Sequence, residues 1–214
     1  MGVTVMIRRR ARSGQEDTFL RTALRGTASY ATADTMLQHA RVLQAVHDPS
    51  AFIWIAEWES REAYAARTGA VAAELDRLAM EPPERSWLHP VHSSEFMDRR
   101  ITALTCVIVD AAADTIETAR AMMQTRGRSL LEAHPGFAAR HLYHDLERAH
   151  RLVAVLGWTS LAAAEQAVQI IDGHADELVD ALGARRQSFL GKVAIEVRQG
   201  GEPEVWYPAG AQAG

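Results

Sequence analysis

The chain carries the same motif twice, and this duplication limits its possible folds more than any other feature. In each copy an apolar run ends in Trp, one residue follows, and then come Ser and an Ala-rich segment. The copies occupy residues 51–60 and 151–160. Runs rich in β-branched and aromatic residues are typical of strands, and the hydroxyls of Ser60 and Ser160 can cap a following helix. The sequence therefore predicts a duplicated domain.

The segments around the motif also repeat in order. Before it come a strand, a helix and a second strand, and after it come a helix and a last strand. The expected strands are 3–8, 37–46, 51–58 and 87–96 in the first half, and 101–109, 137–146, 151–158 and 192–197 in the second. Residues 37–46 could also form a helix, but the turn residues that follow favour a strand. Each half thus reads β-α-β-β-α-β, the ferredoxin-like order.

Two local expectations concern Gly and Pro. The helix after Ser60 is expected to bend or break at Gly69, and to be over before Pro82. The strand 87–96 contains Pro90, which has no N–H for a ladder hydrogen bond. That strand must therefore lie at an edge or contain a bulge.

The predicted fold class is α+β, with two ferredoxin-like repeats at residues 1–97 and 101–198 and a loosely held tail at 199–214. Helices cover one face of each sheet, so the other face needs a cover. With two copies in one chain, the simplest arrangement packs the two bare faces together as a barrel-like core. We expect a monomer or a homodimer.

Composition narrows the functional class. The 214 residues carry a net charge of -4, which argues against a nucleic-acid partner. Cys106 is the single cysteine, so no disulfide can form within the chain. The sequence begins without the apolar segment of a signal peptide, and no apolar run reaches membrane length. We therefore expect a cytoplasmic protein with no membrane partner.

The motif itself resembles a known family. Trp58-Glu59-Ser60-Arg61-Glu62-Ala63 is similar to the W-E-S-x-E-A pattern of the antibiotic biosynthesis monooxygenase (ABM) domain, in the dimeric α+β barrel superfamily. Trp158-Thr159-Ser160 matches it more loosely, and His134-Pro135-Gly136-Phe137 resembles the family's entry into the second strand. The likeness spans both halves, as a tandem duplication.

The resemblance implies an enzyme that oxidises a polycyclic aromatic, polyketide-type intermediate. It implies that no metal or flavin is needed, because in such enzymes the substrate phenolate itself reacts with oxygen. A flavin supplied by a partner reductase stays open. The reaction would take place in a pocket between the sheet and the helices.

Tryptophans are the candidates for binding a small aromatic substrate. Trp54 and Trp58 share one face of the third strand and could form a wall against a flat ring. The competing interpretation is that both fill the core. In the second half Trp158 remains while Ala154 replaces the other Trp. We therefore expect the pocket in the first half, with Trp158 marking the alternative.

Acid–base candidates lie on the second strand of each half. His39 and Arg41 share a face there, as do His141 and Tyr143. A neutral histidine can take the proton of a phenol, and an arginine can stabilise the phenolate. Each could equally be a structural or surface residue. No metal site is expected, because His141 and His144 face opposite sides of a strand.

Two other functions compete with oxygenation. A cofactor-free cyclase or isomerase could use the same barrel, since it needs only a shaped pocket and a proton relay. A non-catalytic binding or scaffold protein would use the duplicated sheet for ligand binding or assembly alone. Oxygen uptake in the presence of an aromatic substrate separates the first function from both alternatives.

Overall fold

The computed structural model describes residues 2–31, 36–96, 99–199 and 201–205. The first repeat contains β1 (Val3–Arg10), α1 (Glu16–Ala31), β2 (Leu37–Ala45), β3 (Ala51–Trp58), α2 (Arg61–Leu78) and β4 (Glu84–Glu95). The second contains β5 (Ala103–Asp110), α3 (Ile116–Leu131), β6 (Phe137–Asp145), β7 (Arg151–Trp158), α4 (Leu161–Leu182) and β8 (Arg185–Arg198). A short β9 (Glu204–Val205) follows. The predicted α+β class and the two β-α-β-β-α-β repeats are confirmed.

The two repeats agree almost residue for residue. β1 begins at residue 3 and β5 at 103, β3 spans 51–58 and β7 spans 151–158, and the helices that follow begin at 61 and 161. Both helices are capped as expected, because the Oγ atoms of Ser60 and Ser160 each accept a hydrogen bond from a backbone N–H three residues on, at 3.1 Å. A given position in one repeat therefore has its counterpart one hundred residues away.

Of the two outcomes expected at Gly69, a bend or a break, the break is not found. α2 runs without interruption from Arg61 to Leu78. Replacing Ala by Gly inside a helix costs about 1 kcal/mol, which the packing of the buried Ala63, Tyr64 and Leu75 can offset. Glycine weakens this helix without ending it.

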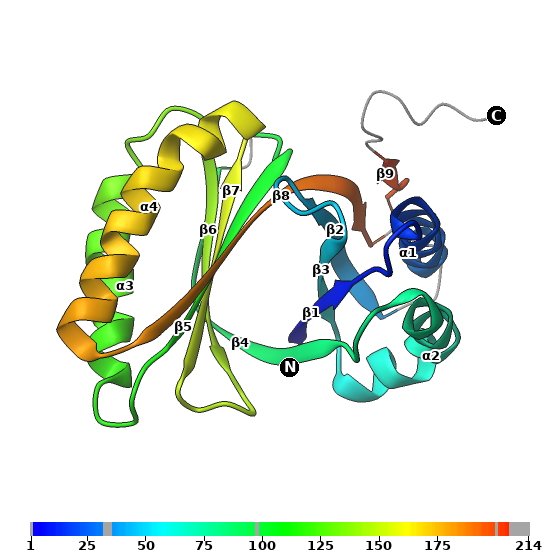
Figure 1. The fold of residues 1–214 in the computed structure, drawn as a ribbon, viewed down its shortest axis with the longest axis horizontal. Coiled ribbons are helices and arrows are strands. Elements are labelled where there is room, and N and C mark those ends of the chain that lie inside the picture. The colour runs from blue at the N-terminus through cyan, green and yellow to red at the C-terminus, as the bar shows by residue number, and fades with distance from the viewer. Residues whose placement is uncertain (1, 32–35, 97–98, 200, 206–214) are drawn as a thin grey trace. The chain divides into compact units, whose positions relative to one another are not determined.

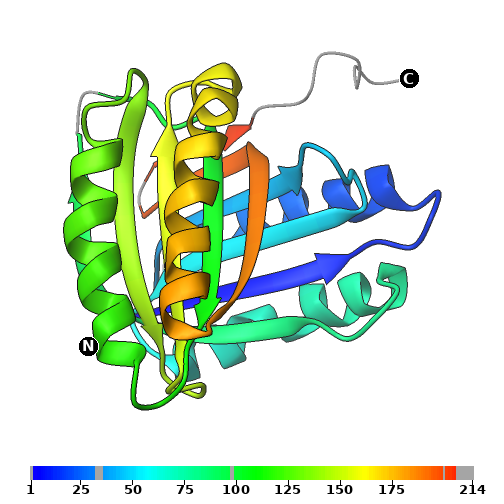
Figure 2. The ribbon, with the colours of Figure 1, turned by 60° about the vertical axis from the view of Figure 1, so that its left-hand side comes forward.

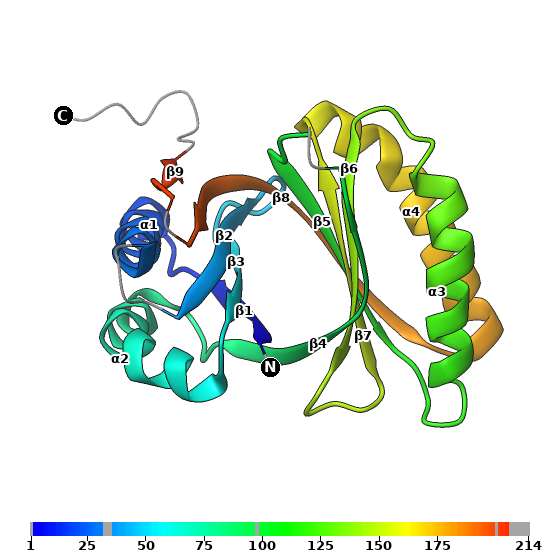
Figure 3. The same ribbon diagram turned by 180° about the vertical axis from the view of Figure 1, so that it is seen from behind.

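The first compact unit comprises residues 1–87 together with 192–214. Its strands are ordered β2-β3-β1-β4, and the end of β8 pairs with the other edge of β2. α1 and α2 lie on one face of this sheet (Figures 1 and 3). The core between them is apolar and aromatic, with Phe19, Phe52, Trp58 and Tyr64 among its buried members.

The second compact unit comprises residues 88–191. Its strands are ordered β6-β7-β5-β8, and the end of β4 pairs with β6 from Leu88 opposite Asp145 to Glu95 opposite Ala139. The register shifts between Pro90 and His92, so the bulge predicted from Pro90 is confirmed. α3 and α4 lie side by side on one face of the sheet (Figure 2).

The boundaries of the compact units differ from those of the sequence repeats at two strands, β4 and β8. Each begins in one unit and ends in the other. β8 is also longer than expected, since it starts at Arg185 rather than at Lys192. Its first residues are mostly exposed and polar, which hid them from a search for apolar alternation. Among the described residues, no helix is long and apolar enough to cross a membrane.

Candidate functional site

The tryptophans of the first repeat lie on the helix-covered face of the sheet. Trp54 and Trp58 both pack against Tyr30 of α1, with ring centroids 6.0 and 5.7 Å away, and against Tyr64 of α2 at 6.3 and 5.8 Å. Trp58 is fully buried, and Trp54 is partly buried. The structure thus brings the two predicted tryptophans together in an aromatic cluster.

Trp58 and Trp158 occupy equivalent places but differ in one hydrogen bond. Both side chains are 0% exposed. The indole N–H of Trp158 donates to Thr105 Oγ1 at 3.1 Å, whereas the buried indole N–H groups of Trp54 and Trp58 meet no acceptor among the described residues. Trp58 and Trp158 are therefore core residues in this state of the protein, and neither presents a surface to a ligand.

His39 and Arg41 do not lie near the tryptophans as expected. Val42 stands opposite Trp54, so Val42 shares the face of that residue, and the neighbouring Arg41 points to the other side of the sheet. A register shift between Leu37 and His39 causes the reversal. Leu37 and Ala40 both belong to the helix-side core, which simple alternation from Leu37 would not allow.

On that other face, both residues bind one carboxylate. His39 Nε2 and Arg41 Nη2 each lie 2.9 Å from Glu196 Oε1, and Arg198 Nε lies 3.1 Å away. Burial opposes the ionisation of Glu196, but the hydrogen bond from His39 and the charge of Arg41 outweigh it and hold the pKa of Glu196 at about 2. This ion cluster fastens the end of β8 to β2.

A register shift also places His141 and Tyr143 on the face of the sheet opposite to that of Trp158. A register shift between Phe137 and Ala139 places Leu142, opposite Ala154, in the helix-side core. His141 therefore faces away from Trp158, with its Nδ1 3.1 Å from Ser93 Oγ and its ring stacked on Tyr143 at 6.1 Å. The expected grouping of these two residues with Trp158 is not found.

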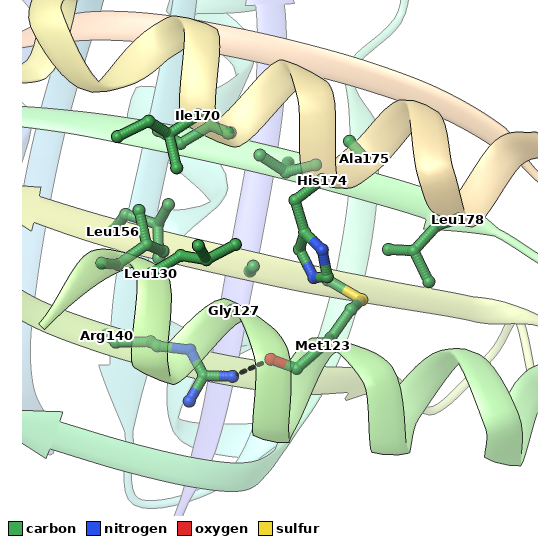
Figure 4. Close-up of a pocket in the computed structure, with 13 residues that line it drawn as sticks. Met123, Gly127, Leu130, Arg140, Leu156, Ile170, His174, Ala175 and Leu178 are labelled. Carbon is green, nitrogen blue, oxygen red and sulfur yellow. Dashed lines mark hydrogen bonds between the residues drawn. The ribbon is translucent and has the colours of Figure 1, made fainter.

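A cavity in the second repeat holds a different pair of polar residues. It lies between the sheet and the helices α3 and α4 and has a volume of about 40 Å³ (Figure 4). Its walls are mainly apolar side chains such as Met123, Leu156, Ile170 and Leu178. Arg140 of β6 and His174 of α4 supply its titratable groups.

Arg140 is a buried cation that forms no salt bridge with any residue the structure describes. The residue as a whole is only 2% exposed. Nη2 donates to the backbone carbonyl of Met123, while Nη1 has no acceptor among the described residues. Burial lowers the pKa of this guanidinium. The charge of Glu132 offsets this burial only in part. A buried charge without a salt bridge is costly, so this position favours an anionic ligand.

His174 faces Arg140 across Gly127 of α3. A Cβ built on Gly127 would lie 3.7 Å from His174 Nε2 and 3.9 Å from Arg140 Nη2. Neither ring nitrogen of His174 has a hydrogen-bond partner among the described residues, although Nδ1 lies 3.8 Å from a Glu177 carboxylate oxygen. Burial lowers the pKa of His174, which keeps the imidazole neutral at neutral pH. The missing side chain of Gly127 thus leaves a space beside both a neutral base and a free cation.

Sequence reasoning missed both residues, and only His174 left a signal. It falls at helical spacing among Ile170, Ile171 and Leu178, on the buried side of α4. A lone polar residue on an apolar helix face is the pattern that would have found it. Arg140 left no such signal, because the register shift after Phe137 reverses which side chains of β6 face the helices.

Comparisons with known proteins agree with the fold. Residues 2–73 match the family described as antibiotic biosynthesis monooxygenase. No curated protein sequence matches the chain. The structure is similar to that of an anthrone oxidase-like protein, with 12% identity, 94% of each chain covered and a TM-score of 0.72. It is also similar to a proposed monooxygenase from Fusobacterium nucleatum, with 7% identity over 96% of this chain and 98% of the other and a TM-score of 0.74.

A third similar structure shows that the fold is compatible with more than one activity. A proposed chlorite dismutase shares 10% identity over 90% of this chain and 95% of its own, with a TM-score of 0.62. Identities this low establish the fold alone, and function must come from the site. The resemblance expected from the W-E-S motif is confirmed for residues 2–73, the part of the chain that the family model matches.

Proposed function

Because its first repeat is an antibiotic biosynthesis monooxygenase domain, we propose that this chain is an enzyme that oxidises a planar phenolic compound with molecular oxygen. We assign the reaction to the cavity of the second repeat. The observation that carries the proposal is the buried Arg140, which forms no salt bridge among the described residues, facing the neutral His174 across the space beside Gly127. A polyketide-type polycyclic phenol is the substrate class that the family suggests.

The two polar residues have complementary roles in this reaction. His174 Nε2 accepts a proton from the substrate, because its lowered pKa leaves the imidazole neutral and available as a base. The guanidinium of Arg140, which forms no salt bridge among the described residues, then stabilises the resulting oxyanion. Glu177, near Nδ1, favours the imidazolium formed in the first step.

The chemistry balances without a resident cofactor. The ionised substrate supplies the electrons, and O₂ accepts them. When a ring CH₂ group becomes C=O, the substrate loses two hydrogens and gains one oxygen atom, and the second oxygen atom leaves with those hydrogens as water. The apolar walls exclude bulk water and strengthen the hydrogen bond from Arg140 to the substrate anion.

The cavity must widen to admit such a substrate. Its volume is about 40 Å³, whereas pockets for small molecules usually measure roughly 300–1,000 Å³. Two lining side chains offer room: Leu130 is 43% exposed, and Met123 is unbranched and adapts easily. We therefore place the entrance at the Leu130 end of the gap between α3 and α4.

The test is oxygen consumption with a panel of anthrones and naphthols, followed by mass analysis of products formed under isotopically labelled O₂. We expect incorporation of one labelled atom by the unmodified protein. His174→Asn should reduce the rate by about two orders of magnitude, and His150→Asn, a change at an exposed histidine, should not. An isomerised product without oxygen uptake would indicate a cyclase or isomerase, and no turnover would indicate a binding protein.

A further inference from the structure

His174 lies between two charges of opposite sign. On one side, an oxygen of the Glu177 carboxylate, one turn further along α4, lies 3.8 Å from Nδ1. On the other side, Nε2 and Arg140 Nη2 both border the space beside Gly127. Figure 4 shows the His174 side chain reaching from α4 toward α3. The imidazole thus presents Nδ1 to an anion, and Nε2 to the cavity and its cation.

Glu177 is itself paired with a residue of the neighbouring helix. Arg126 of α3 donates from Nη1 to Glu177 Oε2 at 2.8 Å, and the same oxygen is the one near Nδ1 of His174. The side chains of Arg126 and Glu177 are 60% and 51% exposed, whereas that of His174 is 12% exposed. The ion pair therefore joins α3 to α4 at the surface and keeps one carboxylate oxygen beside the buried ring.

The charges around the ring bear on its tautomer. A neutral imidazole has one N–H, and the surroundings of the two ring nitrogens decide which of them holds it. The carboxylate near Nδ1 attracts a proton to that nitrogen, and the guanidinium on the Nε2 side repels one. Neither ring nitrogen has a hydrogen-bond partner among the described residues, so no other contact there opposes these charges. Both charges favour a proton on Nδ1 and a lone pair on Nε2.

We propose that Glu177, paired with Arg126, is a positioning residue that fixes His174 as the Nδ1–H tautomer, with the lone pair of Nε2 facing the space beside Gly127. At 3.8 Å the carboxylate acts on Nδ1 through its charge and without a direct hydrogen bond. The role rests on the proposed function, because only this tautomer can take a proton at Nε2 from a phenol bound beside Gly127. The tautomer itself can be measured whether or not the protein is an oxidase.

The first repeat lacks this arrangement. It has a cavity of about 30 Å³ at the equivalent place, between the sheet and α1 and α2. There the counterparts of the histidine, the glutamate and the arginine, one hundred positions earlier, are Glu74, Arg77 and Gly26. Arg25 of α1 and Glu74 of α2 also form an ion pair, at 2.7 Å. An ion pair between the helices is therefore common to both repeats, whereas the imidazole beside it belongs to the second.

The test is ¹⁵N NMR of the histidine side chains in the full-length protein, because a ring nitrogen with a lone pair and one with a proton resonate far apart. The signals of His174 are assigned by their loss in His174→Asn. At neutral pH we expect the unmodified protein to show the proton on Nδ1. Glu177→Gln removes the negative charge, so it should shift the tautomer toward Nε2–H. Glu165→Gln, at an exposed position of the same helix, is the matched control and should not. An Nε2–H tautomer in the unmodified protein, or an unchanged tautomer in Glu177→Gln, would overturn the proposal.

A pH titration of the same signals separates an effect of charge from an effect of helix packing. The charge of Glu177 raises the pKa of His174, while those of Arg126 and Arg140 lower it, and burial makes the largest contribution by lowering it. Glu177→Gln should therefore lower that pKa further, and Arg126→Gln should raise it. Shifts in the same direction would show that both variants act by loosening the contact between α3 and α4, and would contradict the proposal.

Oxygen uptake then distinguishes the positioning role from the proposed oxidation. In an active protein, Glu177→Gln should lower kcat/KM about 10–100-fold, the usual effect of losing a residue that orients another, with little change in thermal unfolding, since exposed ion pairs contribute little stability. A shifted tautomer with unchanged kcat/KM would refute the positioning role. Absence of oxygen uptake in the unmodified protein would refute the oxidation and with it that role, while the spectra would still decide the tautomer.

Discussion

The two repeats have the same elements at the same spacing, yet their cavities are lined for different chemistry. The first is walled by Tyr30 and Trp54 and lacks an unpaired ionisable group among its described residues. The second has Leu130 and Ala154 at those positions and adds Arg140 and His174. The better match to the family motif and the pair Arg140–His174 thus lie in different repeats. Duplication preserved the framework and allowed the two cavities to diverge.

The largest difference between the repeats should appear when the buried cation is removed. We expect Arg140→Met to lower kcat/KM by roughly two to three orders of magnitude, the usual effect of losing one oxyanion donor. Stability should fall little, because the change removes a buried charge that forms no salt bridge among the described residues. Arg120→Met, at an exposed arginine of α3 paired with Glu117, is the matched control. Equal losses of activity in both variants would contradict the role of Arg140.

A second difference concerns how the exchanged strand ends are held. The end of β8 is fixed to β2 by Glu196 with His39 and Arg41, whereas a side-chain link between the end of β4 and β6 is a hydrogen bond of His141 with Ser93. The pKa of Glu196, about 2 in the folded protein, lies below its ordinary value of 4.5. The stability it contributes is therefore complete above pH 4.5 and is lost as the pH falls toward 2.

We expect Glu196→Gln to lower the free energy of unfolding at neutral pH by about 2–3 kcal/mol and to flatten its decline in acid. The measurement is urea unfolding as a function of pH, with hydrogen exchange at β8 and β4 read separately. Glu202→Gln, at an exposed position, should leave both unchanged. Equal acid opening of β8 and β4 would show that the Glu196 cluster does not distinguish the two ends.

The space beside Gly127 is a further difference between the repeats, because the equivalent residue of the first repeat, Thr27, carries a side chain. We expect Gly127→Ala to weaken binding of a phenolic ligand to the second cavity about tenfold, since the added methyl group lies 3.7 Å from His174 Nε2. Alanine should also stabilise the helix by up to about 1 kcal/mol. Gly173→Ala makes the same change in α4, where a Cβ would meet no atom within 4 Å. Weakened binding in both variants would exclude a local effect.

The smallest expected difference separates the two core tryptophans. Trp158→Phe leaves Thr105 Oγ1 without its donor, whereas Trp58→Phe removes an N–H that has no acceptor among the described residues. We therefore expect Trp158→Phe to be the more destabilising by about 1 kcal/mol. Thermal unfolding of the two variants gives the comparison. Equal costs would imply that Trp58 also makes a hydrogen bond, through an ordered water.

The sequence predicted the framework well because its signals are local. Ser60 and Ser160 cap helices, Pro90 marks a bulge, and apolar alternation marks the strands. The grouping of the candidate side chains could not be predicted, for a reason that alternation does not reveal. The shifts after Leu37 and Phe137 reverse which side chains of β2 and β6 face the helices, so His39 and His141 point outward while Arg140 points inward. Such a reversal depends on pairing with β3 and β7, which is set by tertiary structure.

The exchange of strand ends has a consequence for folding on the ribosome. The second compact unit is contiguous, so it is complete once residue 191 has emerged. The first unit is begun earlier but lacks residues 192–198, the part of β8 that pairs with the edge of β2, until the whole second unit has been synthesised. The outer edge of strand β2 in the N-terminal sheet therefore stays unpaired while the second unit folds. An exposed edge is a site for pairing with a neighbouring nascent chain, so polysomes are where this protein is most vulnerable to misassembly.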